Sequence, residues 1–192
     1  MALPRNSDTP RGQELQAILL AAEPSMRDWP QPNKSDIVII GGIVVLFSYV
    51  DFNLRRLVEA FHYANLLPEE WREKASKLDS AQLAKAIWET PVWAGPEDDV
   101  AALKELEELR LLRNLVAHFM VRRFPNDDAY LFVTKSARDY KRAFGAEPAL
   151  GVAMTAIVEC QQVKGALHRI EYIHNWLAQV VPAFEKQIGL PL

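Results

Sequence analysis

Residues 35–61 read SDIVIIGGIVVLFSYVDFNLRRLVEAF, and the architecture expected for the chain follows from how this segment is interpreted. Apolar residues recur in it at three- and four-residue steps, which is the period of one face of an α-helix. These residues are Ile43, Phe47, Val50, Leu54, Leu57, Val58 and Phe61. Ser35 followed by Asp36 is typical of a helix start. Gly41-Gly42 among β-branched residues also permits two short strands joined by a tight turn, but the unbroken stripe favours one long helix.

The uncharged run inside this segment bears on where the protein is located. It extends from Ile37 to Val50 and contains 14 residues, whereas a membrane-spanning helix needs about 20. Met1 to Arg11 lacks the basic-then-apolar order of a signal peptide. We therefore expect a core segment, no contact with a membrane, and a cytoplasmic protein.

Composition is that of an ordinary globular protein, with 49% hydrophobic and 24% charged residues in 192. The lone Cys160 excludes an intramolecular disulfide framework. Four scattered histidines make no pairing with zinc-site spacing, so neither a metal nor another cofactor is expected. Residues 1–34 hold five of the twelve prolines and are interpreted as an N-terminal arm. Residues 35–192 are then the helical domain.

Six further elements are expected along the chain. They are a short helix beginning at Pro68, a helix from Ser80 to Trp88, a long helix from Glu97 to about Arg123, a strand at Tyr130–Thr134, a brief helix capped by Ser136, and a final helix after Pro148.

The final helix has an apolar stripe whose steps alternate between four and three residues, as in a bundle core or a dimer seam. Its members are Val163, Leu167, Ile170, His174, Leu177, Val181, Phe184 and Ile188. The two long helices near 36–66 and 150–187 are expected to pack antiparallel, together with the 97–123 helix. The predicted fold class is therefore all-α, a helical bundle with a short strand or loop insertion after the 97–123 helix.

Charge is distributed unevenly along the chain. Residues 97–108 contain six acids and one lysine, whereas residues 109–142 contain eight bases and three acids. A local excess of five positive charges is enough to hold a few phosphates; a solvated helix face is the alternative. The net charge of −3 argues against a protein that coats DNA.

The basic segment also carries the residues best suited to catalysis. Arg110, Asn114 and His118 are spaced i, i+4, i+8 and share one helix face. The long side chain of Arg113 can reach back toward that face. A planar bidentate donor for phosphate next to a group that titrates near neutrality is suited to phosphodiester chemistry.

Residues 113–118, RNLVAH, resemble the R-x4-6-H motif of HEPN domains. HEPN domains are helical bundles, usually dimeric, and many are metal-independent ribonucleases of toxin–antitoxin, abortive-infection and RNA-processing systems. Their arginine and histidine lie in a cleft at the dimer interface. The resemblance covers residues 35–188, apart from the 124–148 segment.

This resemblance implies the roles of particular residues. Arg113 and His118 would be the catalytic pair, with Asn114 as the polar residue beside the arginine. The partners implied are RNA, a second copy of the chain, and an antitoxin or another partner protein. Basic residues near the pair are then expected to bind RNA: Arg110, Arg122 and Arg123.

The reaction expected from this pair begins with attack of a ribose 2′-OH on the adjacent phosphorus, with His118 as general base and Arg113 stabilising the phosphorane oxygens. One histidine cannot be base and acid at once, so a dimer is expected to supply a second His118. DNA, which has no 2′-OH, is excluded as a substrate.

Three alternatives accompany this interpretation. The chain could be a catalytically silent HEPN-like module that binds RNA, a nucleotide or a partner protein. It could be a structural protein in which Arg113 pairs with Asp51 or Glu59. A second match to the spacing, Arg169 to His174, lacks the polar residue and the alanine of the first match. We interpret His174 as a core or seam residue.

Overall fold

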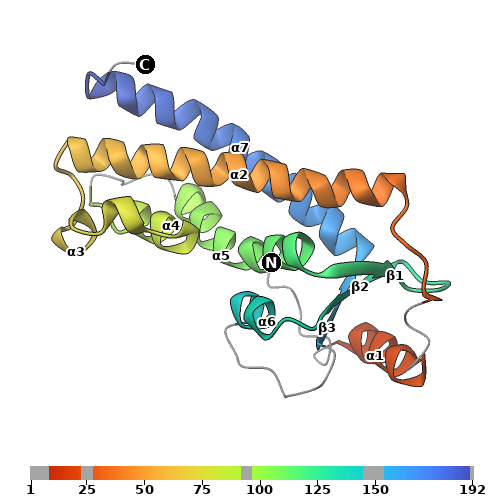
Figure 1. The fold of residues 1–192 in the computed structure, drawn as a ribbon. Helices are drawn as coiled ribbons and strands as arrows, with labels where there is room; N and C mark the ends of the chain where they lie inside the picture. Colours follow the sequence, from red (N-terminus) through yellow and green to blue (C-terminus); the bar gives the residue numbers. More distant parts are fainter. Residues whose placement is uncertain (1–8, 23–27, 92–96, 145–153, 191–192) are drawn as a thin grey trace. The chain divides into compact units, whose positions relative to one another are not determined.

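The computed structural model describes residues 9–22, 28–91, 97–144 and 154–190. It is mostly helical, at 71% helix, with a small antiparallel sheet of three strands (Figure 1), so the expected helical class with a strand insertion is confirmed at this level. The elements are α1 (Pro10–Ala22), α2 (Lys34–Tyr63), α3 (Glu69–Arg72), the 3-10 turn η2 (Ala75–Lys77), α4 (Ser80–Trp88), α5 (Glu97–His118), β1 (Met120–Arg123), β2 (Ala129–Thr134), α6 (Ala137–Phe144), β3 (Met154–Glu159) and α7 (Cys160–Gln187).

The chain forms two compact units. Unit 1 contains residues 1–44 and 111–167, and unit 2 contains residues 45–110 and 168–192. Helices α2, α5 and α7 each contribute residues to both units. The sheet and the motif residues from 113 to 118 belong to unit 1.

The sheet of unit 1 has the order β1-β2-β3. Met120 pairs with Val133 and Arg123 with Tyr130 in the first ladder, and Thr134 pairs with Met154 in the second. Two helix boundaries differ from their predicted positions because the neighbouring residues form strands of this sheet.

The 97–123 helix ends early, at His118, because residues 120–123 pair as strand β1. The final helix begins late, at Cys160, because residues 154–159 form β3; residues 148–153 lie outside the described part of the chain. Both misplaced stretches are short, and each is a strand because it pairs with β2, which local sequence patterns do not show.

The predicted N-terminal arm contains a helix that covers the sheet. Leu15 and Leu19 of α1 form a buried cluster with residues of the sheet and its loops. The other members are Trp29, Phe124, Ala129, Leu131 and Ile157. The rings of Trp29 and Phe124 lie 4.7 Å apart. Part of the proline-rich segment 1–34, which was interpreted as an arm, therefore belongs to the core.

Helix α2 begins with a reciprocal cap. The backbone N–H of Asp36 donates to Asn33 Oδ1 at 3.0 Å, and the N–H of Asn33 donates to Asp36 Oδ2 at 2.8 Å. The expected cap at Ser35 is therefore wrong, since Asn33 performs it. The helix is 30 residues long and passes through Gly41-Gly42 without a break. The alternative of two strands joined by a turn is therefore also wrong.

In unit 2, α2 and α7 run parallel. Tyr49 packs on His174 with ring centroids 5.4 Å apart, and Phe61 meets Phe184 edge-on at 4.9 Å. Arg56 Nε also donates to Glu185 Oε1 at 3.0 Å. The ring contacts advance from residue 49 to residue 61 on α2 as they advance from residue 174 to residue 184 on α7, so the predicted antiparallel packing of these two helices is wrong.

In unit 1, the starts of α2 and α7 both contact the β1–β2 hairpin. Asp36, near the start of α2, binds Arg123 of the β1–β2 hairpin. Cys160, the first residue of α7, donates its N–H to the carbonyl of Asp128 in the same hairpin, at 2.9 Å. Both helices therefore begin at the hairpin.

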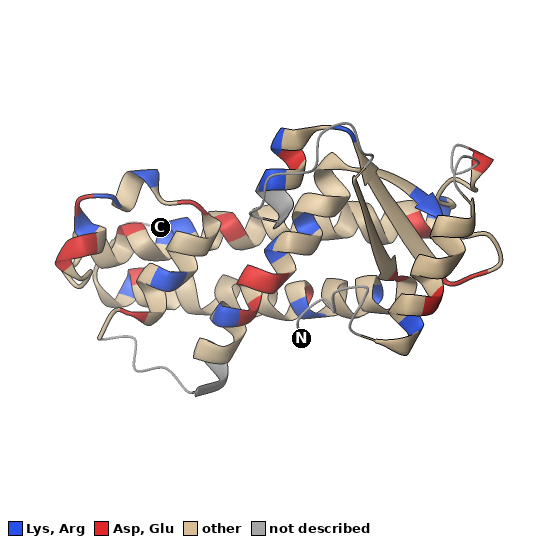
Figure 2. Cartoon of the chain, turned by 90° about the horizontal axis from the view of Figure 1, so that it is seen from below, with Lys and Arg blue, Asp and Glu red and all other residues tan. Residues whose placement is uncertain are grey.

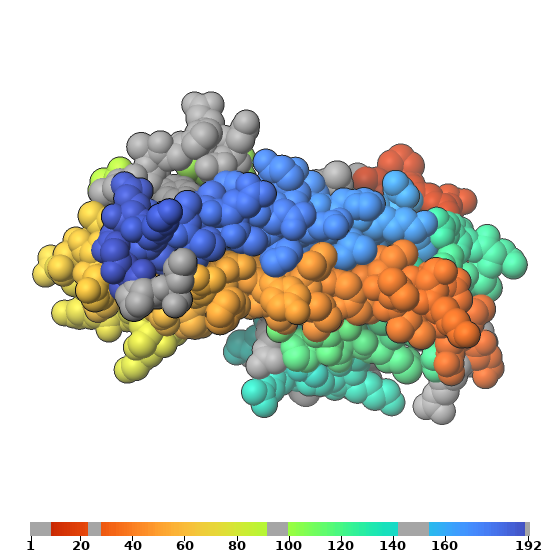
Figure 3. All heavy atoms as spheres, turned by 90° about the horizontal axis from the view of Figure 1, so that it is seen from above, coloured from red at the N-terminus to blue at the C-terminus, as the bar shows by residue number. Residues whose placement is uncertain are grey.

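The outer face of α2 is apolar. The helix is long and apolar enough to cross a membrane by length and composition, with a mean hydropathy of 2.1 over its most apolar 18 residues, of which 28% is buried. A core helix of a soluble protein passes the same test. Figure 3 shows the outer surface of α2 beside α7. Its exposed large side chains are Ile37, Val38, Val45, Tyr49, Phe52 and Tyr63. The uncharged run was predicted to be a core segment, but only one of its faces is buried.

The two adjacent glycines of α2 give a matched stability test. A Cβ at Gly41 would meet nothing within 4 Å, whereas a Cβ at Gly42 would lie 3.1 Å from Leu167 Cδ1. Alanine in a helix interior is favoured over glycine by up to about 1 kcal/mol. We expect Gly41→Ala to raise the free energy of unfolding in urea by about this amount and Gly42→Ala to raise it less. Equal gains would contradict the close packing of α2 on Leu167.

Candidate functional site

Helix α5 places the predicted site residues on one continuous helix. Its last eight residues, 111–118, belong to unit 1 and contain Arg113, Asn114 and His118. Arg110 lies on the part of α5 that belongs to unit 2. Asn114 and His118 are four residues apart and so lie on the same side of the helix.

The arginine of the motif is held by the amide beside it. Arg113 is half-buried and donates from Nη1 to Asn114 Oδ1 at 3.2 Å. The Asn114 side chain is buried, with 4% of the residue exposed. No carboxylate pairs with Arg113 among the described residues of unit 1. A guanidinium has five N–H donors, and the bond to Asn114 uses one of them.

The histidine of the motif lies at the surface. His118 is the last residue of α5 and is exposed. The following residue, Phe119, is buried and closes the last turn by donating its N–H to the carbonyl of Leu115 at 3.0 Å. Of the three motif residues, Asn114 is buried, Arg113 is half-buried and His118 is exposed. A substrate can reach the imidazole.

The second match to the motif has a different environment. Arg169 forms an ion pair with Glu105, with Nε donating to Oε2 at 2.9 Å, and its guanidinium also lies over Tyr172. His174 is half-buried against Tyr49, and its Nδ1 is buried with no hydrogen-bond partner among the described residues. The arginine and histidine of this match are thus both engaged in packing unit 2.

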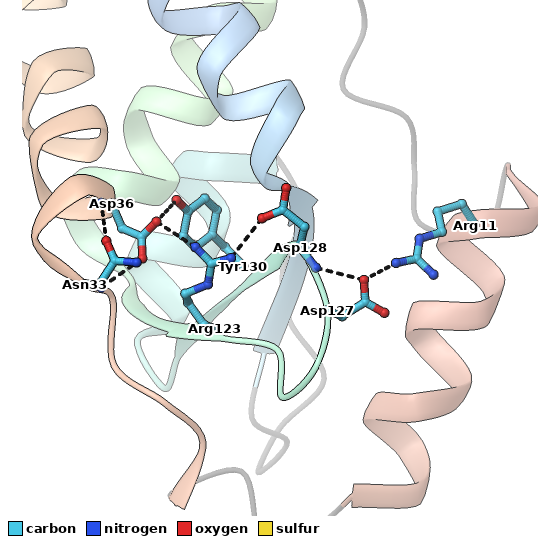
Figure 4. A network of polar contacts seen from close by, with 7 residues as sticks. All are labelled: Arg11, Asn33, Asp36, Arg123, Asp127, Asp128 and Tyr130. Atoms are coloured by element: carbon cyan, nitrogen blue, oxygen red, sulfur yellow. Dashed lines mark hydrogen bonds and ion pairs between the residues drawn. The ribbon is translucent and has the colours of Figure 1, made fainter.

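All three predicted RNA-binding arginines are half-buried. The Nε atoms of Arg110 and Arg122 are buried and have no hydrogen-bond partner in the described chain. The third, Arg123, is occupied by the protein itself. Its Nη1 donates to Asp36 Oδ1 at 2.7 Å and its Nη2 to Asp128 Oδ1 at 2.8 Å (Figure 4).

Asp36 is the centre of this polar network, which the sequence did not reveal. The residue is only 3% exposed. Besides Arg123 and the N–H of Asn33, its carboxylate accepts the hydroxyl of Tyr130 at 2.6 Å. A buried carboxylate is tolerated when a cation and hydrogen bonds compensate its lost hydration. The only sequence signal was an acid in the first helical turn.

Cys160 borders the same network and has no nucleophilic character. Burial raises the pKa of its thiol to about 12, and its hydrogen bond to Asp128 adds to this effect. In turn, the bond from Cys160 is the main cause that lowers the pKa of Asp128. Burial and the bond to Asp36 raise the pKa of Tyr130 as well. A thiol of this kind is a structural core group.

Among the described residues, no group of three or more His, Cys, Asp or Glu side chains is arranged to hold a metal ion. The candidate site therefore consists of an arginine, an amide and an imidazole. Such a set can bind a phosphate and transfer a proton.

The raised pKa of Cys160 predicts its reactivity. We expect iodoacetamide at pH 8 to modify the native protein much more slowly than the urea-unfolded chain, because the buried thiol stays protonated. The unfolded thiol titrates near 8.5, below its folded pKa, so this group's contribution to stability is complete below pH 8 and is lost as pH rises toward 12. Equal modification rates in both states would contradict this burial.

Comparison of the chain with protein-family models, with curated proteins and with solved structures finds no significant match.

Proposed function

We propose that the protein is a metal-independent endoribonuclease of the HEPN type, with Arg113 and His118 as its catalytic pair, acting on cytoplasmic RNA. One observation carries the proposal: the end of α5 presents an exposed imidazole beside a guanidinium that pairs with no carboxylate in its own unit and is held by a buried amide. The geometry is that of an anion site next to a proton acceptor.

The contrast with the second match supports this assignment. Both matches have an arginine five residues before a histidine, but Arg169 is neutralised by Glu105 whereas Arg113 is bonded to a neutral amide. A guanidinium already paired with a carboxylate has little attraction left for a phosphate. The side chain of Arg113 keeps its full positive charge for a ligand.

The proposed reaction is an intramolecular transfer at phosphorus. His118 takes the proton of a ribose 2′-OH as its oxygen bonds to the adjacent phosphorus. The bond from phosphorus to the 5′-oxygen of the next nucleotide breaks, which gives a 2′,3′-cyclic phosphate and a 5′-OH after protonation of the leaving oxygen. Arg113 donates to the non-bridging oxygens as negative charge builds on them. Asn114 holds Arg113 in place.

The proton for the leaving oxygen calls for a second acid, and we propose that His118 of a second copy supplies it. The exposed apolar face of α2 supports a dimer. No charged residue lies between Asp36 and Asp51, so two copies of this face can meet without burying an unpaired charge. Val38 is the most exposed of its large side chains, at 73%.

Substitution of the motif separates an enzyme from a binding module. His118→Ala should lower the cleavage rate of RNA about 10²–10⁴-fold, since the general base is lost. Arg113→Lys should lower it about 10²-fold, because lysine keeps the charge but loses the planar fork. Cleavage should persist in EDTA. Product analysis by mass spectrometry should find 2′,3′-cyclic phosphate ends.

His174→Ala is the matched control. It should lower the free energy of unfolding by about 1 kcal/mol, through the lost contact with Tyr49, and should leave cleavage intact. Binding of RNA without cleavage would favour the silent module. Loss of folding in His118→Ala, with neither binding nor cleavage by the parent chain, would show a structural role for the pair.

Charged substitutions on α2 test the assembly. The parent chain should sediment as a dimer at micromolar concentration. Val38→Glu together with Val45→Glu should give monomers, because the interface would bury unpaired carboxylates, and cleavage should fall at least about 10-fold as the second His118 is lost. Leu20→Glu on α1, where the leucine is 65% exposed, should change neither. A parent chain that is strictly monomeric would remove the shared-site mechanism.

A further inference from the structure

We propose that Lys135, Arg138 and Lys141 form a basic surface that binds the phosphate backbone of the RNA strand leading to His118. The proposal rests on the proposed function and deepens it, since it assigns a substrate-binding surface to residues outside the motif. All three side chains are exposed. Two of them, Lys135 and Arg138, make no ion pair with any described residue.

The register of the β1–β2 hairpin places Lys135 at the same end of the hairpin as His118, the last residue of α5. Met120 pairs with Val133. His118 precedes Met120 by two residues, and Lys135 follows Val133 by two. His118 and Lys135 therefore lie at the same open end of the β1–β2 hairpin, where α5 enters the sheet and the chain leaves it for α6.

Local structure turns the charges of this segment outward. Ser136 caps α6 by accepting the N–H of Asp139 at 3.2 Å, and its own N–H donates to Thr134 Oγ1 at 3.0 Å. Arg138 and Lys141 are then three residues apart on one helix face, while Tyr140 is half-buried. Figure 2 shows the blue of lysine and arginine on α6.

The surface has the net charge that a polyanion requires. Between residues 135 and 141 the only acid is Asp139, which is half-buried. The other two acids of the basic segment are matched by arginines, since Asp127 pairs with Arg11 and Asp128 with Arg123. Lys135 and Arg138, at the start of α6, are therefore exposed bases of the segment that pair with no carboxylate among the described residues.

The chemistry of the surface specifies phosphates rather than bases. Exposed lysine and arginine side chains that neutralise backbone charge carry no sequence information. The ligand class is a single-stranded nucleic acid. Selection of RNA over DNA is left to the 2′-OH at His118. The surface should hold either strand equally well.

Charge removal on an inactive background tests the surface. In the His118→Ala chain, which leaves RNA intact, Lys135→Gln, Arg138→Gln and Lys141→Gln would be combined. A fluorescent 20-nucleotide RNA would be titrated between 0.05 and 0.3 M salt. Each single-stranded phosphate contact contributes about 0.7 to the slope of log K against log salt. The triple variant should lose about 2 from this slope and bind roughly 10- to 100-fold more weakly at 0.1 M salt.

A matched control removes three exposed charges from unit 2. Lys74→Gln, Lys77→Gln and Lys186→Gln should alter the slope and the affinity by less than about twofold. A charge-preserving set, Lys135→Arg, Arg138→Lys and Lys141→Arg, should bind like the His118→Ala chain, and it keeps the test valid if the glutamine variant folds poorly. Single-stranded DNA of the same sequence should lose affinity by the same factor as RNA.

Failure of this inference and failure of the proposed function give different results. If the His118→Ala chain binds RNA and both triple glutamine variants weaken binding equally, the α6 surface is overturned and the ribonuclease proposal stands. If only RNA, and not DNA, loses affinity, the contacts are not to phosphates and the inference is wrong. If the His118→Ala chain binds no RNA at all, both proposals fail.

Discussion

A buried carboxylate organises unit 1. Asp36 is removed from water at the first turn of α2, and the energy of that burial is offset by Arg123, Tyr130 and the N–H of Asn33. If any one of these donors were lost, the buried charge would be less fully compensated. The contact ties the start of α2 to both strands of the β1–β2 hairpin. The start of α7 is tied to the same hairpin through Asp128, so the two longest helices share one origin and one direction.

This anchoring explains which parts of the fold could be predicted from sequence. Helical periodicity and end signals are local, so α2, α4 with its cap at Asp79, and the strand β2 could be predicted within a few residues. The strands β1 and β3 could not, because each owes its conformation to pairing with β2. The parallel packing of α2 and α7 could not be predicted either. It is seen only in contacts between residues far apart in the chain, such as Tyr49 with His174 and Phe61 with Phe184.

The candidate site divides in the same way. The spacing from Arg113 to His118 is a local feature of the sequence, and both residues lie on α5. The residues alone already favoured this match over the one ending at His174. The partners of the two arginines, which no spacing reveals, are a second difference between the matches. The excess of positive charge can be counted in the sequence, but the partners of each basic side chain cannot. The carboxylates of the hairpin occupy Arg123, whereas Lys135 and Arg138 are exposed.

Arginine serves three purposes in this chain, and the carboxylates around it decide which. Arg123 meets two carboxylates and becomes a structural centre; Arg169 meets one and fastens two helices of unit 2. Arg113 meets a neutral amide, which orients the guanidinium without cancelling its charge. Replacing that amide by a carboxylate would satisfy the guanidinium and lower its attraction for phosphate. The asparagine beside Arg113 therefore orients the guanidinium without neutralising it, which is the property that the proposed phosphate binding requires.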